Sequence, residues 1–530
     1  MIRKIAMILA LAVVVGLPFV FRPPAEERRD YDRELVVVTP HNEAIRHELS
    51  RGFRDWYEER TGEVVRVDWR IPGGTSEIAR LVASEYQAAF RNYWIRELGE
   101  PWSRRVLGAF DNPRMVLRDD PDDDSVEEAA RQAFLRSNVG IGIDLFFGGG
   151  SFEFSRQAAA GRLVDSGVRE VRPEWFEDES IPLELSGEPF RDAQDRWIGV
   201  VLSSFGIIYN KVSLERIGFD RYPETWDDLA DPRLFGELGL ADPTKSGSIA
   251  KAFEMVIQEQ IQTVRAERDG EGDYVADGWE RGMRLIQAMG GNARYFTDSA
   301  TKPIVDVALG DAAAGMSIDF YGRFQEEMLV RRGSDRFRYV TPVGGSTISV
   351  DPIGMFRGAP NPDLARAFIE YTLSLEGQKL WNLRPGTPGG PQRFALRRLP
   401  IRKEFYSDEF RSDRSDPDIF PYETAEDFVY HSEWTGPLFR EMSFIIRVMC
   451  LDVHDELRAA WRELVRADFP EKATELFFDV SRVSYPATRN TVSAAIRSSD
   501  PLDEVRLARE LGAGFREQYR EAGRLARRGE

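Results

Sequence analysis

The sequence predicts an α/β fold built from more than one compact unit. Two stretches, 35–90 and 226–320, alternate short β-branched runs with amphipathic helical segments. That alternation is typical of a largely parallel sheet covered by helices. The length points the same way, because 530 residues exceed the roughly 250–300 that one hydrophobic core accommodates.

Each element of the first stretch has its own signal. Residues 35–38 form a β-branched run and are expected to be a buried strand. Residues 42–61 carry apolar side chains at helical spacing, and 64–69 alternate like a second strand. The turn at 72–76 contains glycine and hydroxyl residues that can cap the next helix, 77–90.

The composition excludes several classes of protein. The formal net charge is −18, which argues against a nucleic-acid partner bound through its phosphates. Cys450 is the one cysteine, so neither an internal disulfide nor a multi-thiolate metal site can form. It lies in an apolar run and is expected to be buried. No cofactor and no resident metal are predicted.

The amino terminus is predicted to direct export. Two basic residues precede an apolar run at 5–21, and two prolines and a charged segment follow it. This order is typical of a secretory signal, and the run is also at the short limit for a membrane-spanning helix. Segment 1–33 is therefore expected to be a cleaved signal peptide or an anchor in the inner membrane, with the remaining chain periplasmic or otherwise extracytoplasmic.

The later part of the chain interrupts and resumes this pattern. Residues 91–138 are expected to be an insertion, and its acidic run at 119–124 to be a solvated turn rather than a calcium loop. The β-rich run at 197–210 is longer than most strands and is broken at Ser203-Ser204. Helical patterns dominate from residue 362 onward.

Four loops follow strand-like runs directly, where ligands bind in open α/β sheets. They are 39–42, 147–151, 242–248 and 317–322. The third joins hydroxyl residues, glycine and one lysine at the start of a predicted helix, which suits an anion. Its order is not the GxxxxGK[ST] of a nucleotide P-loop. A plain N-cap turn is the alternative interpretation.

Three further observations complete the candidate site. Glycines at 148–150 allow a backbone to approach a ligand closely, and Tyr321 offers a phenol. Ser299 belongs to a second small, polar helix start. The residues expected to bind a ligand are Thr39, His41, Asn42, Gly149, Gly150, Ser203, Thr244, Lys245, Ser246, Gly247, Ser248, Ser299, Asp319 and Tyr321.

A longer motif resembles a known family. The run Thr-Trp-Asp-Asp-Leu-Ala-Asp-Pro-Arg-Leu-Phe-Gly at 225–236, followed by Ala241-Asp242-Pro243 and Ser246-Gly247-Ser248, resembles the extracellular solute-binding proteins of bacterial ABC importers. Pieces at 144–150, 205–210 and 365–381 resemble the same family in its order. The similarity is to the branch with ferric-ion, phosphonate and sugar-phosphate binders, and covers roughly residues 34–400.

The resemblance implies a two-lobe, type II periplasmic-binding-protein fold, in which two α/β lobes joined by two crossing strands close on a ligand. The crossings are expected at Ser203-Ser204 and near Val350-Asp351-Pro352. The expected division is 34–203 for the first part of lobe 1, 204–350 for lobe 2, 351–400 for the return to lobe 1, and 401–530 for a mostly helical extension. Charged helices at 456–464 and 503–527 are expected to pack on the first lobe or to contact a partner.

The resemblance also implies function without catalysis: capture of a small ligand and its delivery to an ABC permease. Ferric binders of this family use adjacent tyrosines where this chain has Phe320 and Tyr321, so ferric ion is disfavoured. A phosphonate, phosphorylated sugar or carboxylate suits the Ser/Gly/Lys helix start better. The alternatives are a membrane-anchored sensory or scaffold module and an enzyme on the same architecture, for which no catalytic motif is found.

Overall fold

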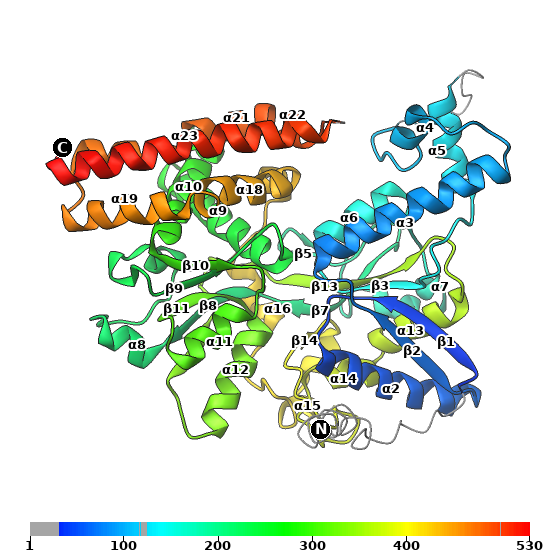
Figure 1. The fold of residues 1–530 in the computed structure, drawn as a ribbon. Helices are drawn as coiled ribbons and strands as arrows, with labels where there is room; N and C mark the ends of the chain where they lie inside the picture. The colour runs from blue at the N-terminus through cyan, green and yellow to red at the C-terminus, as the bar shows by residue number, and fades with distance from the viewer. Residues whose placement is uncertain (1–30, 116, 118–124, 499) are drawn as a thin grey trace, which may run out of the picture.

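The chain folds into two lobes that lie side by side (Figure 1). This computed structural model describes residues 31–115, 117, 125–498 and 500–530. The predicted leader at 5–21 and the acidic run at 119–124 lie outside these residues. Within the described ranges, no helix is long and apolar enough to cross a membrane.

The sheet of the first lobe has the strand order β14-β7-β13-β3-β1-β2, with β4 paired to β13. β1 runs parallel to β2 and β3, whereas β13 runs antiparallel to β3 and β7. The strands are β1 (Arg33–Val38), β2 (Val65–Arg70), β3 (Leu145–Phe147), β4 (Leu163–Val164), β7 (Ile198–Ser203), β13 (Ser349–Phe356) and β14 (Leu399–Pro400).

The sheet of the second lobe has the order β10-β9-β11-β8-β12. β9 runs parallel to β10 and β11, and β8 runs antiparallel to β11 and β12. The strands are β8 (Phe205–Asn210), β9 (Leu238–Ala241), β10 (Ala293–Thr297), β11 (Ala314–Ile318) and β12 (Phe337–Val340). A separate hairpin joins β5 (Glu184–Leu185) to β6 (Glu188–Pro189).

Strands β7 and β8 belong to different sheets although only Ser204 separates them, and the chain returns to the first sheet between β12 and β13. A bond from the Phe205 amide to Ser346 Oγ, 2.9 Å long, joins the two passages. The strands at these passages pair antiparallel with their neighbours. Both sheets are therefore mixed, and the expectation of a largely parallel sheet was wrong.

The helices form where the sequence supplies caps and an apolar stripe. In α2 (Glu43–Thr61), Asn42 accepts a bond from the Ile45 amide, Gly62 ends the helix in a left-handed conformation, and the buried stripe includes Phe53. The other long helices of the lobes are α3 (Thr75–Arg96), α6 (Ser151–Ala160), α9 (Gly247–Glu267), α10 (Tyr274–Asn292), α11 (Lys302–Leu309), α12 (Asp319–Arg331), α13 (Pro362–Leu373) and α14 (Leu375–Asn382).

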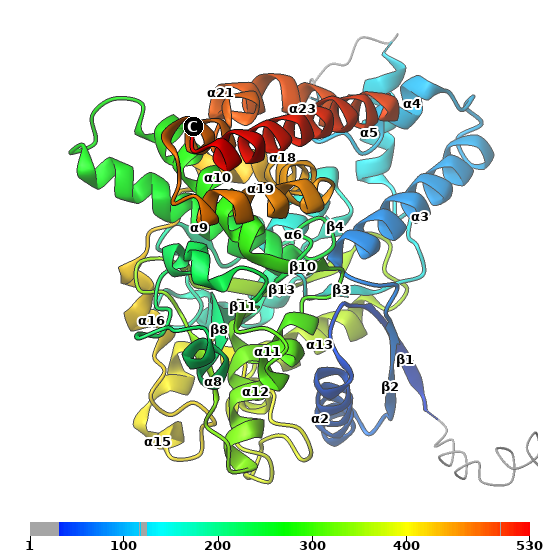
Figure 2. The same ribbon diagram turned by 60° about the vertical axis from the view of Figure 1, so that its left-hand side comes forward.

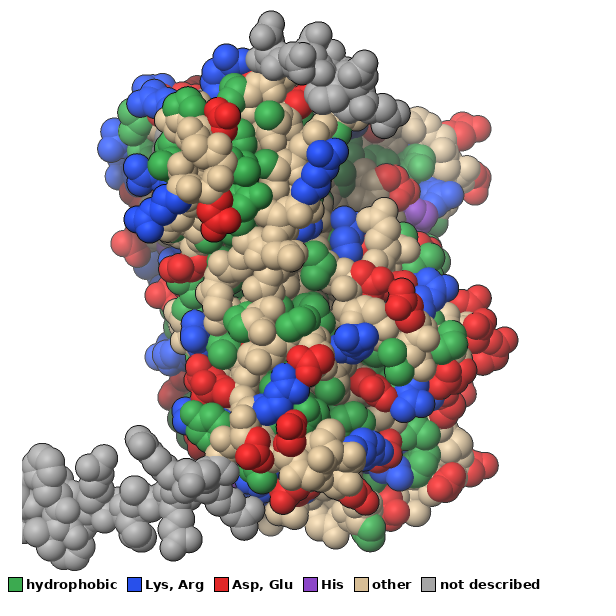
Figure 3. Space-filling model, turned by 90° about the vertical axis from the view of Figure 1, so that its right-hand side faces the viewer, with side chains coloured by type: hydrophobic (Ala, Val, Ile, Leu, Met, Phe, Trp, Pro, Cys, Tyr) green, Lys and Arg blue, Asp and Glu red, His purple; other side chains and the backbone are tan. Residues whose placement is uncertain are grey.

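An arm projects from the first lobe. It consists of the second half of α3 with α4 (Arg104–Ala109) and α5 (Val126–Arg136), and both ribbon views show it standing away from the sheet (Figures 1 and 2). The face of the molecule that carries this arm mixes acidic and basic side chains without a continuous basic patch (Figure 3).

From Phe428 onward, the C-terminal extension packs mainly on the second lobe. The charged helices expected at 456–464 and 503–527 lie in this part, so packing on the first lobe, one of the two alternatives for them, was wrong. Trp461 of the extension fits against Gly291 at the end of α10 and donates to Asn292 Oδ1 at 2.7 Å. Cys450 is fully buried in the same core, as predicted. The helices are α17 (Ser432–Thr435), α18 (Phe439–Ile446), α19 (His454–Arg466), α20 (Glu471–Phe477), α21 (Tyr485–Ala487), α22 (Ser493–Ile496) and α23 (Pro501–Arg528).

Candidate functional site

A buried polar cluster lies where the strands of the first sheet end. Asp351 of β13 accepts bonds on Oδ2 from Arg398 Nη1 at 2.6 Å and from His41 Nε2 at 3.0 Å, and on Oδ1 from the Gly149 amide at 2.5 Å. Arg398 also donates to Ser203 Oγ at 2.8 Å. Three of the predicted residues, His41, Gly149 and Ser203, are thereby brought together by Asp351 and Arg398, which were not predicted.

The charges of this cluster balance. Burial lowers the pKa of His41 despite its bond to Asp351, so the imidazole is neutral near pH 7. Burial alone would raise the pKa of Asp351, but the guanidinium of Arg398 and the bond with His41 hold it far below its usual value. The cluster therefore consists of one ion pair, Asp351 with Arg398, and one uncharged imidazole, His41. We call these three residues the neutral floor.

The second lobe meets this floor through two aromatic residues. The centre of the Phe320 ring lies 4.2 Å from the guanidinium carbon of Arg398, and the Tyr321 phenol lies near Asn42 and Arg398, which both act to lower its pKa. Burial raises the pKa of Tyr321, which favours the neutral phenol over the tyrosinate that a ferric ion requires. Among the described residues there is no group of three or more His, Cys, Asp and Glu side chains that could hold a metal.

Three helix N-termini from both lobes converge beside the floor. A Cβ built at Gly149, before α6, would lie 2.5 Å from Thr75 Oγ1 in the first turn of α3. A Cβ built at Gly247, in the first turn of α9, would lie 3.4 Å from the Gly149 carbonyl oxygen. The positive ends of α3, α6 and α9 therefore share one small region.

Two of these helix ends lack a side-chain cap. The N-cap residues of α3 and α6 are Gly74 and Gly150, which have no side chain to accept from the helix amides. In α9 the N-cap Ser246 accepts from the Ile249 amide at 3.4 Å. Unsatisfied amides at helix N-termini are ready donors for an anion.

The remaining predicted residues have varied surroundings. Thr39 is fully buried, and its Oγ1 accepts from the His41 amide. Thr244 turns toward Asp242, with which its hydroxyl bonds at 2.7 Å, while Lys245 is exposed. Asp319 is fully buried and paired with Arg323 at 2.7 Å.

Two more of the predicted residues lie at helix starts. Ser248 lies in the first turn of α9. Ser299 is exposed and bonds to Thr301 at 2.9 Å, and none of its bonds reaches the other candidate residues.

Thr75, Asp351 and Arg398 were not among the residues predicted to bind a ligand. Thr75 belongs to a turn predicted to cap a helix, although the glycines before it are a signal for close approach. Asp351 is the one charged residue in the buried strand β13, and a buried charge needs a partner. Arg398 gave no distinct signal, since it is one of many arginines.

Comparison with known proteins identifies the segment that carries these loops. Residues 143–405 match the family described as bacterial extracellular solute-binding protein. This segment belongs to that family. The family is one of binding proteins, and its match covers both passages between the sheets, the α9 loop and Arg398.

Individual relatives of this chain are distant. An uncharacterized protein of Haemophilus influenzae is 27% identical over 237 residues, which cover 45% of this chain and 60% of that protein. The phosphoglycerate transport regulatory protein PgtC of Salmonella typhimurium is 24% identical over 190 residues, covering 36% of this chain and 42% of that protein. The chain thus spans less than two thirds of these curated relatives.

Solved structures of periplasmic binding proteins superimpose on most of the chain. AfuA from Actinobacillus pleuropneumoniae, with fructose-6-phosphate bound, is 16% identical with a TM-score of 0.47, over 78% of this chain and 99% of its own. Iron-bound HitA from Pseudomonas aeruginosa is 15% identical with a TM-score of 0.46, over 78% of this chain and 99% of its own.

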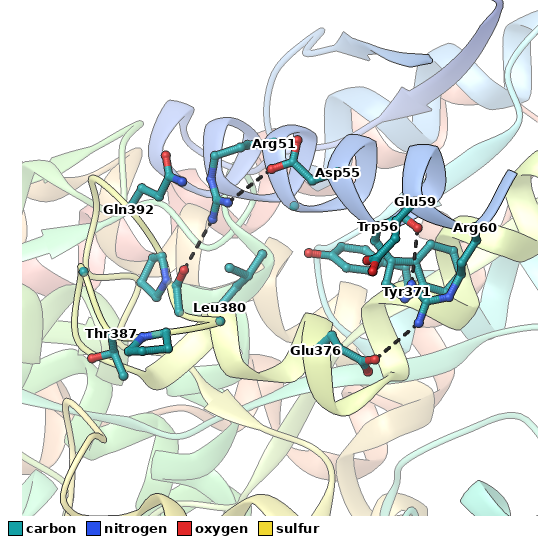
Figure 4. A pocket seen from close by; sticks show the side chains of 16 residues that line it. Arg51, Asp55, Trp56, Glu59, Arg60, Tyr371, Glu376, Leu380, Thr387 and Gln392 are labelled. Carbon is teal, nitrogen blue, oxygen red and sulfur yellow. Dashed lines mark hydrogen bonds and ion pairs between the residues drawn. The ribbon is translucent and has the colours of Figure 1, made fainter. Parts of the chain in front are cut away.

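Two hollows lie away from the interlobe loops. One, of about 880 Å³, lies on the first lobe between α2, α14 and the loop 386–392, with Trp56 and Arg60 at one end (Figure 4). The other, of about 570 Å³, lies between α23 and residues 447–452 of the extension. Neither is lined by a residue of the candidate site.

Proposed function

We propose that this protein captures a small anionic solute between its two lobes outside the cytoplasm and passes it to an ABC-type permease. The observation that carries the proposal is the convergence of α3, α6 and α9, because these helices come from both lobes. An anion there is held by amides that a water-exposed helix end leaves unpaired. The family of the central segment supports the same role.

The two parts of the site suit two parts of one ligand. The helix ends offer amides, the Thr75 and Ser246 hydroxyls and the exposed Lys245, which suit a phosphate, phosphonate or carboxylate. The neutral floor of His41, Asp351 and Arg398 suits uncharged hydroxyl groups, because its own charges already cancel. A phosphorylated polyol or hydroxyacid combines both features.

Two observations count against ferric ion as the cargo. Phe320 takes the place of one of the two adjacent tyrosines that the ferric binders of the family use, and the guanidinium of Arg398 lies over its ring. Burial raises the pKa of Tyr321, which favours the neutral phenol. The name of PgtC, which refers to phosphoglycerate transport, agrees with an organic phosphate.

The test is a binding screen of the purified chain. Phosphoglycerates, hexose 6-phosphates, phosphonates, dicarboxylates and ferric citrate are added separately, and the melting temperature and calorimetric affinity are measured. We expect an organic phosphate or phosphonate to bind one per chain. If no anion in the screen binds, the proposed function is wrong.

A matched pair of variants locates the binding. Ser246→Asp keeps an N-cap side chain on α9 but adds a negative charge beside the ligand, and should weaken binding at least 100-fold. Ser125→Asp makes the same change at the N-cap of α5 in the arm and should leave affinity unchanged. Equal effects of the two variants would show that the ligand does not contact the α9 loop.

A second candidate function is a ligand-sensing module, favoured by the word "regulatory" in the name of PgtC. Deleting the gene in its own cell distinguishes the two. Loss of solute uptake supports delivery to a permease, whereas intact uptake with loss of solute-induced gene expression supports sensing.

A further inference from the structure

The chain passes between the lobes a third time, outside the family-matched segment. Tyr422 and Ala425 pack with the core of the first lobe, whereas Phe428 and Tyr430 belong to the core of the second lobe and the extension. We call residues 425–430 the strap. Two lobes joined at three places have less freedom to separate than two lobes joined at two.

The strap is fixed to the first lobe through the turn of the β5–β6 hairpin. The Tyr430 amide donates to the Ser186 carbonyl oxygen at 2.8 Å. Gly187 has φ +80°, and a Cβ at this position would overlap the carbonyl oxygen of Tyr430. The hairpin turn and the strap therefore fit against each other backbone to backbone, at a position that only glycine can occupy.

The strap is fixed to the second lobe through α9. Gln258 donates to the His431 carbonyl oxygen at 2.7 Å and accepts from the His431 amide at 3.1 Å. Gln262, one turn further along α9, donates to the Val429 carbonyl oxygen at 3.0 Å. The strap thus runs along one side of this helix.

A buried charged cluster joins the same three segments. Lys251 of α9 pairs with Glu188 of β6 at 2.6 Å and with Glu254 at 3.0 Å, and its ammonium lies 3.5 Å from the centre of the Tyr430 ring. Tyr430 and Thr435 both donate to Glu254 Oε1. The side chains of Glu188 and Glu254 are 1% and 0% exposed, so separating the lobes here would leave buried charges without partners.

This cluster lies one helical turn from the converging helix N-termini. Gly247 and Lys251 are four residues apart on α9, which places them on one face and about 6 Å apart along the axis. Because Gly247 and Lys251 belong to the same rigid helix, contacts that hold Lys251 against the first lobe also limit how far Gly247 can move away from it.

We propose that the strap and the Glu188–Lys251–Glu254 cluster hold the start of α9 against the first lobe, so that the loops at Gly149 and Gly247 stay together without a ligand. That these loops bind a ligand rests on the proposed function. That the strap and the charged cluster hold the two lobes together does not depend on it. A site that is already assembled avoids the loss of affinity that a rarely populated closed state imposes.

The experiment measures the distance between the lobes in the full chain by double electron–electron resonance. Spin labels are placed at Arg80 of α3 and Asp298 after β10, both exposed, and Cys450 needs no replacement because it is fully buried. Retained solute is removed first by dialysis under mildly denaturing conditions. We expect one narrow distance distribution, and a broad or two-peaked one would overturn the proposal.

Two variants test whether these contacts hold the lobes together, and each has a matched control. Glu188→Gln removes the ion pair between the lobes, and Gly187→Ala pushes the strap away; both should broaden the distribution at least twofold. Glu475→Gln changes an exposed glutamate, and Gly333→Ala has the same φ of +80° with open space around it, so both should leave the distribution narrow. Unchanged distributions in both test variants would overturn the proposal, whatever the ligand screen gives.

Discussion

At the scale of single residues, the ion pair of Asp351 and Arg398 is the central contact of the candidate site. Removing one partner of a buried ion pair costs about 3–5 kcal/mol, because the other charge stays buried. Asp351→Asn should therefore lower the free energy of unfolding by about 3 kcal/mol at pH 7 in urea titrations. Asp363→Asn, whose partner Arg33 is at the surface, should cost less than about 1 kcal/mol. Similar losses would contradict this account of the cluster.

The same cluster predicts acid sensitivity. The pKa of Asp351 is held below its unfolded value, so its stabilising contribution is present above about pH 4 and is lost as the pH falls below that. The pKa of His41 is lowered by burial, so its contribution is present above about pH 6.5 and is lost on acidification. Wild-type protein should lose stability from pH 6.5 downward, and His41→Gln should remove the part between pH 6.5 and 4.

Glu259 predicts the opposite pH dependence. Burial and the nearby Asp227 raise its pKa to about 8. A folded-state pKa above the unfolded value gives stability that is full below about pH 4.5 and is lost as the pH rises through 8. Glu259→Gln should therefore raise the free energy of unfolding by about 1–2 kcal/mol at pH 9 and leave it unchanged at pH 4. Equal changes at both pH values would show that this carboxyl is not the cause.

At the scale of secondary-structure elements, the three helix ends depend on close backbone approach. Gly149 has φ +118°, and a side chain there would meet Thr75 Oγ1. Gly149→Ala should destabilise the protein by about 1–3 kcal/mol and weaken anion binding at least tenfold. Gly142→Ala, with φ +68° and no atom within 4 Å, is the control and should retain full affinity. The affinities of the two variants are compared by calorimetry with the solute identified in the screen. Equal affinities would contradict the prediction.

Sequence patterns predicted where some elements begin and end, but not which elements pack together. The start of α2 at Asn42 and its end at Gly62 follow local rules, and local chemistry also marked the α9 loop. The docking of α19 on α10 could not be predicted, because an apolar stripe shows that a helix packs but not against what. Likewise Asp351 and Arg398 are 47 residues apart, and only the paired strands bring them together.

At the scale of the whole molecule, the central claim is that both lobes contribute to one site for an anionic solute. The first lobe supplies α3, α6 and the neutral floor, and the second lobe supplies α9 and Tyr321. In our proposal, the strap holds the two lobes together. The partial positive charges of the helix ends and the balanced charges of His41, Asp351 and Arg398 are the reason why we expect a solute with one anionic group and several hydroxyls.

Native mass spectrometry of the full chain as purified tests this claim most directly. We predict one retained small anion per chain, present in Ser125→Asp and absent from Ser246→Asp. A retained cation, or an anion retained equally by both variants, would contradict it.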